Sequence, residues 1–200
     1  MTKGFTLIEL LIVIGILAIL ATTVVLVLNP AQILAESRDT QRISDLGSVN
    51  SAIGLYLATA GSIDMAAVGE CIGETSPNYW ATRAGVTSPY TYAFVSVDQH
   101  ANIERDVDGT GWVPIDFSLI SGGSPLATLP NDPTDTGTDL TAADGHFYTY
   151  TCSGNTFEIN GNMESDKFGN NGGSDVESND GGPAATNAIY EIGTAPGLNL

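Results

Sequence analysis

Two hydrophobic patterns follow one another in the N-terminal third of the chain. Residues 10–28 are almost all apolar. As a helix, this run of nineteen residues would measure about 28 Å, close to the hydrocarbon thickness of a bilayer. The run is longer than the apolar core of a secretory signal, and a charged helical pattern follows it. We therefore expect an uncleaved membrane anchor.

The second pattern, in residues 31–60, predicts an amphipathic helix that continues from the first. Apolar residues recur every three or four positions and form one stripe: Ile43, Leu46, Val49, Ile53 and Leu57. A charged flank of this helix carries opposite charges three or four positions apart: Glu36, Arg38, Asp39, Arg42 and Asp45. Pro30 predicts a kink where the two parts meet, and Gly61 with Ser62 predicts the helix end.

Beyond residue 62 the helical pattern gives way to short β-rich runs separated by turn residues. The strand candidates are residues 90–95, 112–120, 146–152 and 156–162. The Ser-Gly-Asn sequence at residues 153–155 predicts a hairpin between the last two. Three or four antiparallel strands packed on the amphipathic helix give an expected α+β fold.

The charge balance bears on which classes of function the chain can have. The chain carries 23 acidic and 6 basic side chains, a formal net charge of −17. Nucleic-acid binding needs a concentrated cationic surface, and the basic residues are scattered, so we expect no nucleic-acid partner. An acidic surface suits divalent cations, and it also fits a merely solvated face. The two histidines lie in no metal or triad motif, so the chain is not expected to be an enzyme.

Cys71 and Cys152 are the two cysteines of the chain. A zinc site needs about four ligands at fixed spacings, and these are absent from the sequence. Outside the cytoplasm, a disulfide between the two cysteines is the favoured state. Two independent buried thiols are the alternative.

A single carboxylate, Glu9, stands at the start of the apolar region. A charge near the membrane interior is costly and usually has a partner, yet only Lys3 lies nearby in the sequence. The alternative is that Glu9 sits among the lipid headgroups without a role.

Residues 3–9, KGFTLIE, together with the apolar run resemble the class III signal of type IV prepilins and type II secretion pseudopilins. The resemblance implies that a prepilin peptidase cuts between Gly4 and Phe5 and methylates the new N-terminus at Phe5. It also implies that Glu9 pairs with the N-terminal amine of a neighbouring subunit during assembly. Glycine before the cut would let the peptidase approach the bond closely, because it has no side chain.

The resemblance further implies a lollipop-shaped molecule. Its expected parts are a leader (residues 1–4), a transmembrane and filament-core helix (5–28), an amphipathic helix (29–61), a globular α+β head (62–163) and a Gly/Asn/Asp-rich C-terminal segment (164–200). Residues 130–133, Pro-Asn-Asp-Pro, resemble the Pro-x-Asp-Pro loop of major pseudopilins and related pilins. Its two prolines predict a rigid turn with a structural role.

The C-terminal segment combines oxygen ligands with glycines, as a hard cation such as Ca²⁺ requires. The candidate calcium ligands are Asp166, Asn170, Asp175, Glu177 and Asp180. Their spacing does not match an EF-hand, although major pseudopilins carry a calcium loop in a similar place. The alternative is a mobile, solvated loop, and no cofactor is required.

These observations predict a structural subunit of a type IV pilus or pilus-like filament. The first alternative is a type II secretion pseudopilin with a calcium loop, and the second is a membrane-anchored adhesin or binding module. The expected partners are further copies of the chain, the prepilin peptidase, the pilus or secretion assembly machinery and the lipid membrane. The expected location is the inner membrane, with the head outside the cytoplasm, and then a surface or periplasmic filament.

Overall fold

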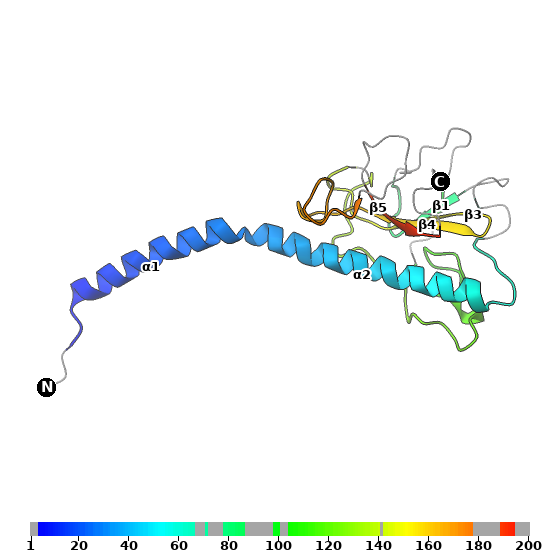
Figure 1. The fold of residues 1–200 in the computed structure, drawn as a ribbon, viewed down its shortest axis with the longest axis horizontal. Helices are drawn as coiled ribbons and strands as arrows, with labels where there is room; N and C mark the ends of the chain where they lie inside the picture. Colours follow the sequence, from blue (N-terminus) through cyan, green and yellow to red (C-terminus); the bar gives the residue numbers. More distant parts are fainter. Residues whose placement is uncertain are drawn as a thin grey trace.

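The N-terminal part of the molecule is a long helix in two parts. The computed structural model describes residues 4–66, 71, 78–86, 98–100, 104–140, 142–177 and 189–194. Helix α1 (Leu7–Leu28) projects away from the head, and helix α2 (Pro30–Thr59) runs along it (Figure 1). The amphipathic helix expected from residue 31 is thereby confirmed, and it ends one residue before Ala60, its C-cap.

The two helices meet at a bend, as Pro30 predicts. Asn29 adopts a left-handed conformation, with φ 38° and ψ 75°, between the two helices. Proline has no amide hydrogen to bond the carbonyl four residues earlier, so the regular ladder is interrupted here. The amides of Gln32 and Ile33 bond instead to the carbonyl of Asn29 and restart the helix.

A small sheet covers one side of α2. Its strands are β1 (Asn78–Ala81), β2 (Asp98–His100), β3 (Thr149–Ser153), β4 (Thr156–Gly161) and β5 (Tyr190–Gly193). The spatial order is β2-β1-β3-β4-β5. Strands β1, β3, β4 and β5 form an antiparallel sheet, which confirms the expected α+β fold. The sequence did not predict β2, which pairs in parallel with β1 at the edge.

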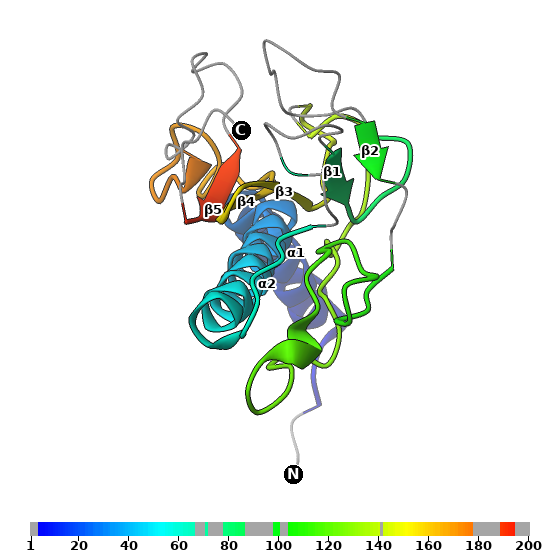
Figure 2. The ribbon, with the colours of Figure 1, turned by 90° about the vertical axis from the view of Figure 1, so that its right-hand side faces the viewer.

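The core lies between α2 and the sheet, whose end-on arrangement is seen in Figure 2. Leu46, Val49 and Ile53 of the predicted apolar stripe are fully buried, and Leu57 packs against the same cluster. They meet residues from alternate positions of the central strands, including Tyr150, Phe157 and Ile159. Alternate residues of a strand point to the same face, so one face of the sheet receives the helix.

The predicted hairpin is present. Strands β3 and β4 pair from Thr149 opposite Asn160 to Ser153 opposite Thr156, which leaves Gly154 and Asn155 as the turn. Gly154 has φ 56°, a conformation that glycine adopts without steric cost. Strand β3 begins three residues later than the sequence indicates, because His146 forms only an isolated bridge with Thr136.

The strand predicted at residues 112–120 is wrong. Trp112 and Val113 are both buried, so the segment does not alternate as a half-buried strand does, and Pro114 cannot donate a ladder hydrogen bond. The segment instead forms turns and a short 3-10 helix, η1 (Phe117–Leu119), which contacts α2. The strand predicted at residues 90–95 lies outside the described residues.

Candidate functional site

The N-terminal segment is open to a processing enzyme. Residues 4–6 precede α1 without regular secondary structure, and the Phe5 side chain is 81% exposed. A Cβ atom built on Gly4 would meet no other atom within 4 Å. The peptide bond between Gly4 and Phe5 therefore lies outside the helix, in a part of the chain that a peptidase can reach.

Glu9 is held at the first turn of α1 by Thr6. The Thr6 amide and hydroxyl both donate to Oε2 of Glu9, at 2.9 Å and 2.7 Å. In return, the Glu9 amide donates to the Thr6 hydroxyl at 3.3 Å. This reciprocal arrangement is a capping box, which satisfies backbone donors that a helix start otherwise leaves free.

Helix α1 has its apolar surface exposed along its whole length. None of its described side chains is buried, and its large apolar residues are mostly more than half exposed. By length and composition, this is the one helix among the described residues that can cross a membrane. Such an apolar surface needs a cover of lipid or of other protein.

At the other end of the apolar region, α2 carries a buried charge cluster. Arg42 lies fully buried and donates from Nε and Nη2 to the two carboxylate oxygens of Asp132, at 2.7 Å and 2.9 Å. Its Nη1 donates to Asp39, also fully buried, at 2.7 Å, and to Glu164 at 3.4 Å. The predicted charged flank of the helix is therefore wrong in part, because Arg42 and Asp39 point into the protein.

This cluster fastens two loops to the helix. Asp39 accepts hydrogen bonds from the amides of Glu164 and Ser165, at 2.9 Å and 2.8 Å. Arg38 adds a two-pronged contact to the Glu164 carboxylate, with Nε donating at 2.7 Å and Nη2 donating to the second oxygen. Asp132 brings in the Pro-Asn-Asp-Pro loop, and its Oδ1 also accepts from the Thr134 amide.

The arginines hold the facing carboxylates in their ionised forms. Burial alone would raise the pKa of Asp132, but the hydrogen bonds and charge of Arg42 outweigh burial and lower it. The hydrogen bond from Arg38 is the main reason that the pKa of Glu164 is also lowered. The arginines and these two carboxylates are therefore all charged at neutral pH.

One residue of this cluster stands in a motif that the sequence analysis noted, but its role was not predicted. The Pro-Asn-Asp-Pro loop was expected to act through its two prolines, whereas its aspartate is the partner of Arg42. Asp39 and Arg42 were correctly paired at a spacing of three. The apolar neighbours of Arg42 on the helix do not show that the arginine itself is buried, since that depends on a loop 90 positions away.

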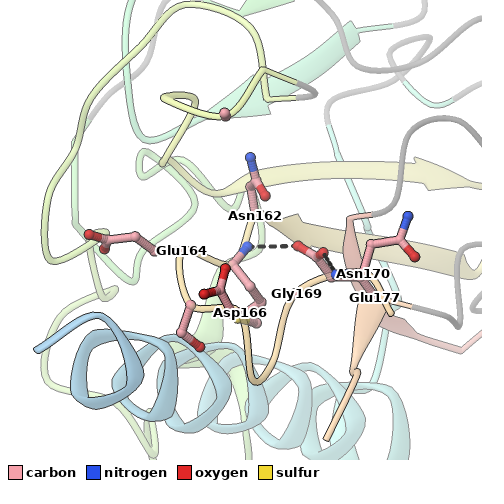
Figure 3. A pocket seen from close by; sticks show the side chains of 9 residues that line it. Asn162, Glu164, Asp166, Gly169, Asn170 and Glu177 are labelled. Atoms are coloured by element: carbon pink, nitrogen blue, oxygen red, sulfur yellow. Dashed lines mark hydrogen bonds between the residues drawn. The ribbon is translucent and has the colours of Figure 1, made fainter. Parts of the chain in front are cut away.

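A pocket of about 320 Å³ lies beside the cluster, where the segment after β4 folds back (Figure 3). It is lined by Ala143, Asn162, Met163, Glu164, Ser165, Asp166, Gly169, Asn170 and Glu177. Glu177 is buried, and its two oxygens accept from the amides of Met163 and Asn170, each at 2.8 Å. These hydrogen bonds lower the pKa of Glu177, but burial has the larger effect and raises it to about 7.

The structure brings some of the candidate calcium ligands together. Asp166, Asn170 and Glu177 line the pocket, while Asp175 accepts from the Asn171 and Glu177 amides, each at 2.9 Å. Asp180 lies outside the described residues. Within the described part of the chain, no three His, Cys, Asp or Glu residues gather as metal ligands. Figure 3 shows Glu164 pointing away from Glu177. The calcium site remains a prediction.

The predicted disulfide is present. Cys71 and Cys152 are bonded, with their Cα atoms 4.9 Å apart. The bond joins the segment after α2 to strand β3, and both residues belong to the hydrophobic core. The expectation of a bridge is therefore confirmed over that of two free thiols.

An exposed apolar helix that continues into a helix packed on a small antiparallel sheet defines a pilin-like α+β architecture. Residues 1–25 match the family model described as the prokaryotic N-terminal methylation motif, which is the type IV pilin and pseudopilin signal. This motif supports a type IV pilin-like or pseudopilin precursor, and proteins with this signal are structural subunits. No curated protein and no solved structure matches the chain.

Proposed function

We propose that this chain is the structural subunit of a type IV pilus or pilus-like filament. The observation that carries the proposal is the exposed apolar surface of α1 behind a methylation motif. Lipid covers this surface in the precursor, and copies of the same helix cover it in the filament. The head, built around α2, faces outward.

Processing and assembly use the residues around the start of α1. The peptidase cuts the bond between Gly4 and Phe5 and leaves a methylated ammonium group on Phe5. Glu9 then supplies the opposite charge to the ammonium group of a neighbouring copy. In a low-dielectric surrounding a lone carboxylate is costly, so this pairing sets the register between copies.

Mass spectrometry of the mature N-terminus, combined with electron microscopy of sheared surface material, tests this function. We expect fibres in which the chain begins at methylated Phe5. A Gly4→Val variant should remain uncut, because its branched side chain crowds the scissile bond. Intact residues 1–4 in chains taken from normal fibres would contradict the proposal.

The role of Glu9 needs a separate variant with a matched control. Glu9→Ala should be cut normally but should form few fibres, whereas Leu10→Ala, an apolar neighbour in the same turn, should assemble. A Glu9→Ala chain that polymerises like the wild type would exclude the charge pairing. If instead the chain is an adhesin that works as a monomer, Glu9→Ala should leave its binding unchanged.

The second candidate is a type II secretion pseudopilin, and the oxygen-lined pocket beside Glu177 favours it. Asp166 and Asn170 would then supply oxygen ligands to Ca²⁺, together with Glu177. At matched ionic strength, Ca²⁺ should raise the melting temperature more than Mg²⁺ does. An equal effect of the two ions would remove the support for a calcium loop.

A further inference from the structure

Thr6 makes three hydrogen bonds with Glu9, and they divide the two carboxylate oxygens into different roles. Both donors, the Thr6 amide at 2.9 Å and the Thr6 hydroxyl at 2.7 Å, bind to Oε2. Among the described residues, no donor binds Oε1. A carboxylate has about four acceptor positions, so Oε1 is free to accept from a further cation.

The arrangement survives the proposed proteolysis. The amide that donates to Glu9 belongs to the peptide bond between Phe5 and Thr6, one bond beyond the proposed cut. The hydroxyl belongs to Thr6 itself. A mature chain beginning at Phe5 therefore keeps all three hydrogen bonds and gains an ammonium group next to them.

The capping box also lowers the cost of placing this turn in a membrane. Unsatisfied amides are costly in hydrocarbon, and the box occupies the amides of Thr6 and Glu9. It also fixes the orientation of the carboxylate before a partner arrives. A group that is already ordered loses less conformational freedom when it binds.

We propose that Thr6 is a positioning residue for assembly. It holds Glu9 by Oε2 and presents Oε1 to the N-terminal ammonium group of a second copy. The inference rests on the proposed function, since it needs copies of this chain to meet through α1. Thr6 acts through the Glu9 carboxylate and makes no contact of its own with the second copy.

The test uses the full-length chain in its own membrane and compares Thr6→Val with Thr6→Ser. Valine has the shape of threonine without the hydroxyl, and serine keeps the hydroxyl. Filament protein is measured as a fraction of cleaved chain, so that a processing defect does not count as an assembly defect. We expect at least about a fivefold loss for Thr6→Val, since hydrogen bonds to a charged group are strong, and recovery with Thr6→Ser.

A plain helix-capping role predicts a different pattern in a Glu9→Gln background. Glutamine still completes a capping box but carries no charge. If Thr6 acts through the carboxylate, Thr6→Val should cause little further loss in this background. The same fractional loss in both backgrounds would overturn the proposal.

The remaining outcomes separate this inference from the proposed function. Normal assembly of Thr6→Val beside failure of Glu9→Ala would overturn the role of Thr6 and leave the filament function standing. Normal assembly of both variants would overturn the charge pairing as well. Complete loss of cleavage in Thr6→Val would place Thr6 in the peptidase step and would also overturn the proposal.

Discussion

At the scale of single residues, Arg42 shows how much depends on one buried side chain. Its guanidinium group is surrounded by the carboxylates of Asp39, Asp132 and Glu164, and none of its side chain is exposed. Burying ions is costly, and the pairing offsets that cost only while every partner is present. The cluster therefore makes the attachment of two loops to α2 depend on one arginine.

Replacing Arg42 should be far more harmful than replacing its neighbour. Arg42→Met leaves Asp39 and Asp132 buried without a cation, and we expect it to lower the free energy of unfolding by about 3–5 kcal/mol. Arg38→Met is the control, because its side chain is 31% exposed and its ion pair should contribute about 1 kcal/mol or less. Denaturant unfolding of the full chain in detergent, followed by tryptophan fluorescence, measures both. Equal losses would contradict a special role for Arg42.

Glu177 should make the stability of the head depend on pH. Its pKa is raised to about 7 in the folded protein, above the ordinary value of 4.5, so the folded state binds this proton more tightly than the unfolded state. The stabilising effect is complete below about pH 4.5 and is lost as the pH rises through about 7. We expect the loss to reach at most about 3 kcal/mol.

A Glu177→Gln variant isolates this contribution. Glutamine cannot accept from both the Met163 and Asn170 amides, so the variant should be less stable than the wild type at pH 5. The difference should shrink between about pH 5 and pH 8, because only the wild type loses its proton in this range. A difference that stays constant with pH would show that Glu177 does not titrate there.

The N-terminal signal could be recognised from sequence because its residues lie within one short segment. Gly4, Phe5 and Glu9 lie within six positions, and their pattern is itself the signal. The contact of Thr6 with Glu9 is equally local, and the Thr-x-x-Glu spacing of a capping box would have revealed it. Arg42 and Asp132 are 90 positions apart, so only the folded chain brings them together.

At the scale of the elements, two glycines show how differently the two faces of α2 are surrounded. Gly54 lies on the exposed face, where an added Cβ atom would meet nothing within 4 Å. Gly161 of β4 lies against the opposite, buried face, and an added Cβ atom would come to 3.1 Å from a methyl carbon of Leu46. The close packing of helix on sheet therefore depends on the absence of a side chain at residue 161.

Alanine at these two positions should have opposite effects. Gly54→Ala should stabilise the chain by about 0.5–1 kcal/mol, because alanine is the better helix former. Gly161→Ala should destabilise it by about 1–3 kcal/mol, because the added carbon would press on the fully buried side chain of Leu46. Thermal unfolding monitored by circular dichroism would compare them. A stabilising Gly161→Ala would contradict the close contact between β4 and α2.

The regular elements followed from local patterns, and the irregular ones did not. The stripe of α2 and the Ser-Gly-Asn turn repeat on scales of two to four residues, which the sequence displays directly. The segment around Trp112 is apolar like a strand, yet its burial is set by contact with α2 and its shape by Pro114. The parallel pairing of β2 depends on a partner that is distant in the sequence, so composition alone could not predict it.

At the scale of the whole molecule, the net charge opposes assembly. Each chain carries a formal charge of −17, and the proposed filament would bring the charges of its copies close together. Salt shortens the range of this repulsion, from a Debye length of about 30 Å at 0.01 M to about 8 Å at 0.15 M. The proposed apolar contact between α1 helices would not be weakened by the same change.

Filament yield should therefore rise with ionic strength. We expect several-fold more sedimentable filament at about 0.15 M than at about 0.01 M monovalent salt, because exposed charges are screened. Cleaved chain without filaments, such as Glu9→Ala, provides the background for the measurement. A yield that falls with salt would indicate that attraction between opposite surface charges dominates assembly.

Helix α1 contributes no buried side chain to the described part of the head. Moving this helix from one apolar surrounding to another leaves the contacts of Arg42, the disulfide and the core unchanged. Under the proposed function, the head therefore folds while the subunit is in the bilayer, and entry into a fibre need not change the described contacts of the head. Folded subunits can accumulate in the membrane beforehand, so the rate of fibre growth need not match the rate at which the chain is synthesised.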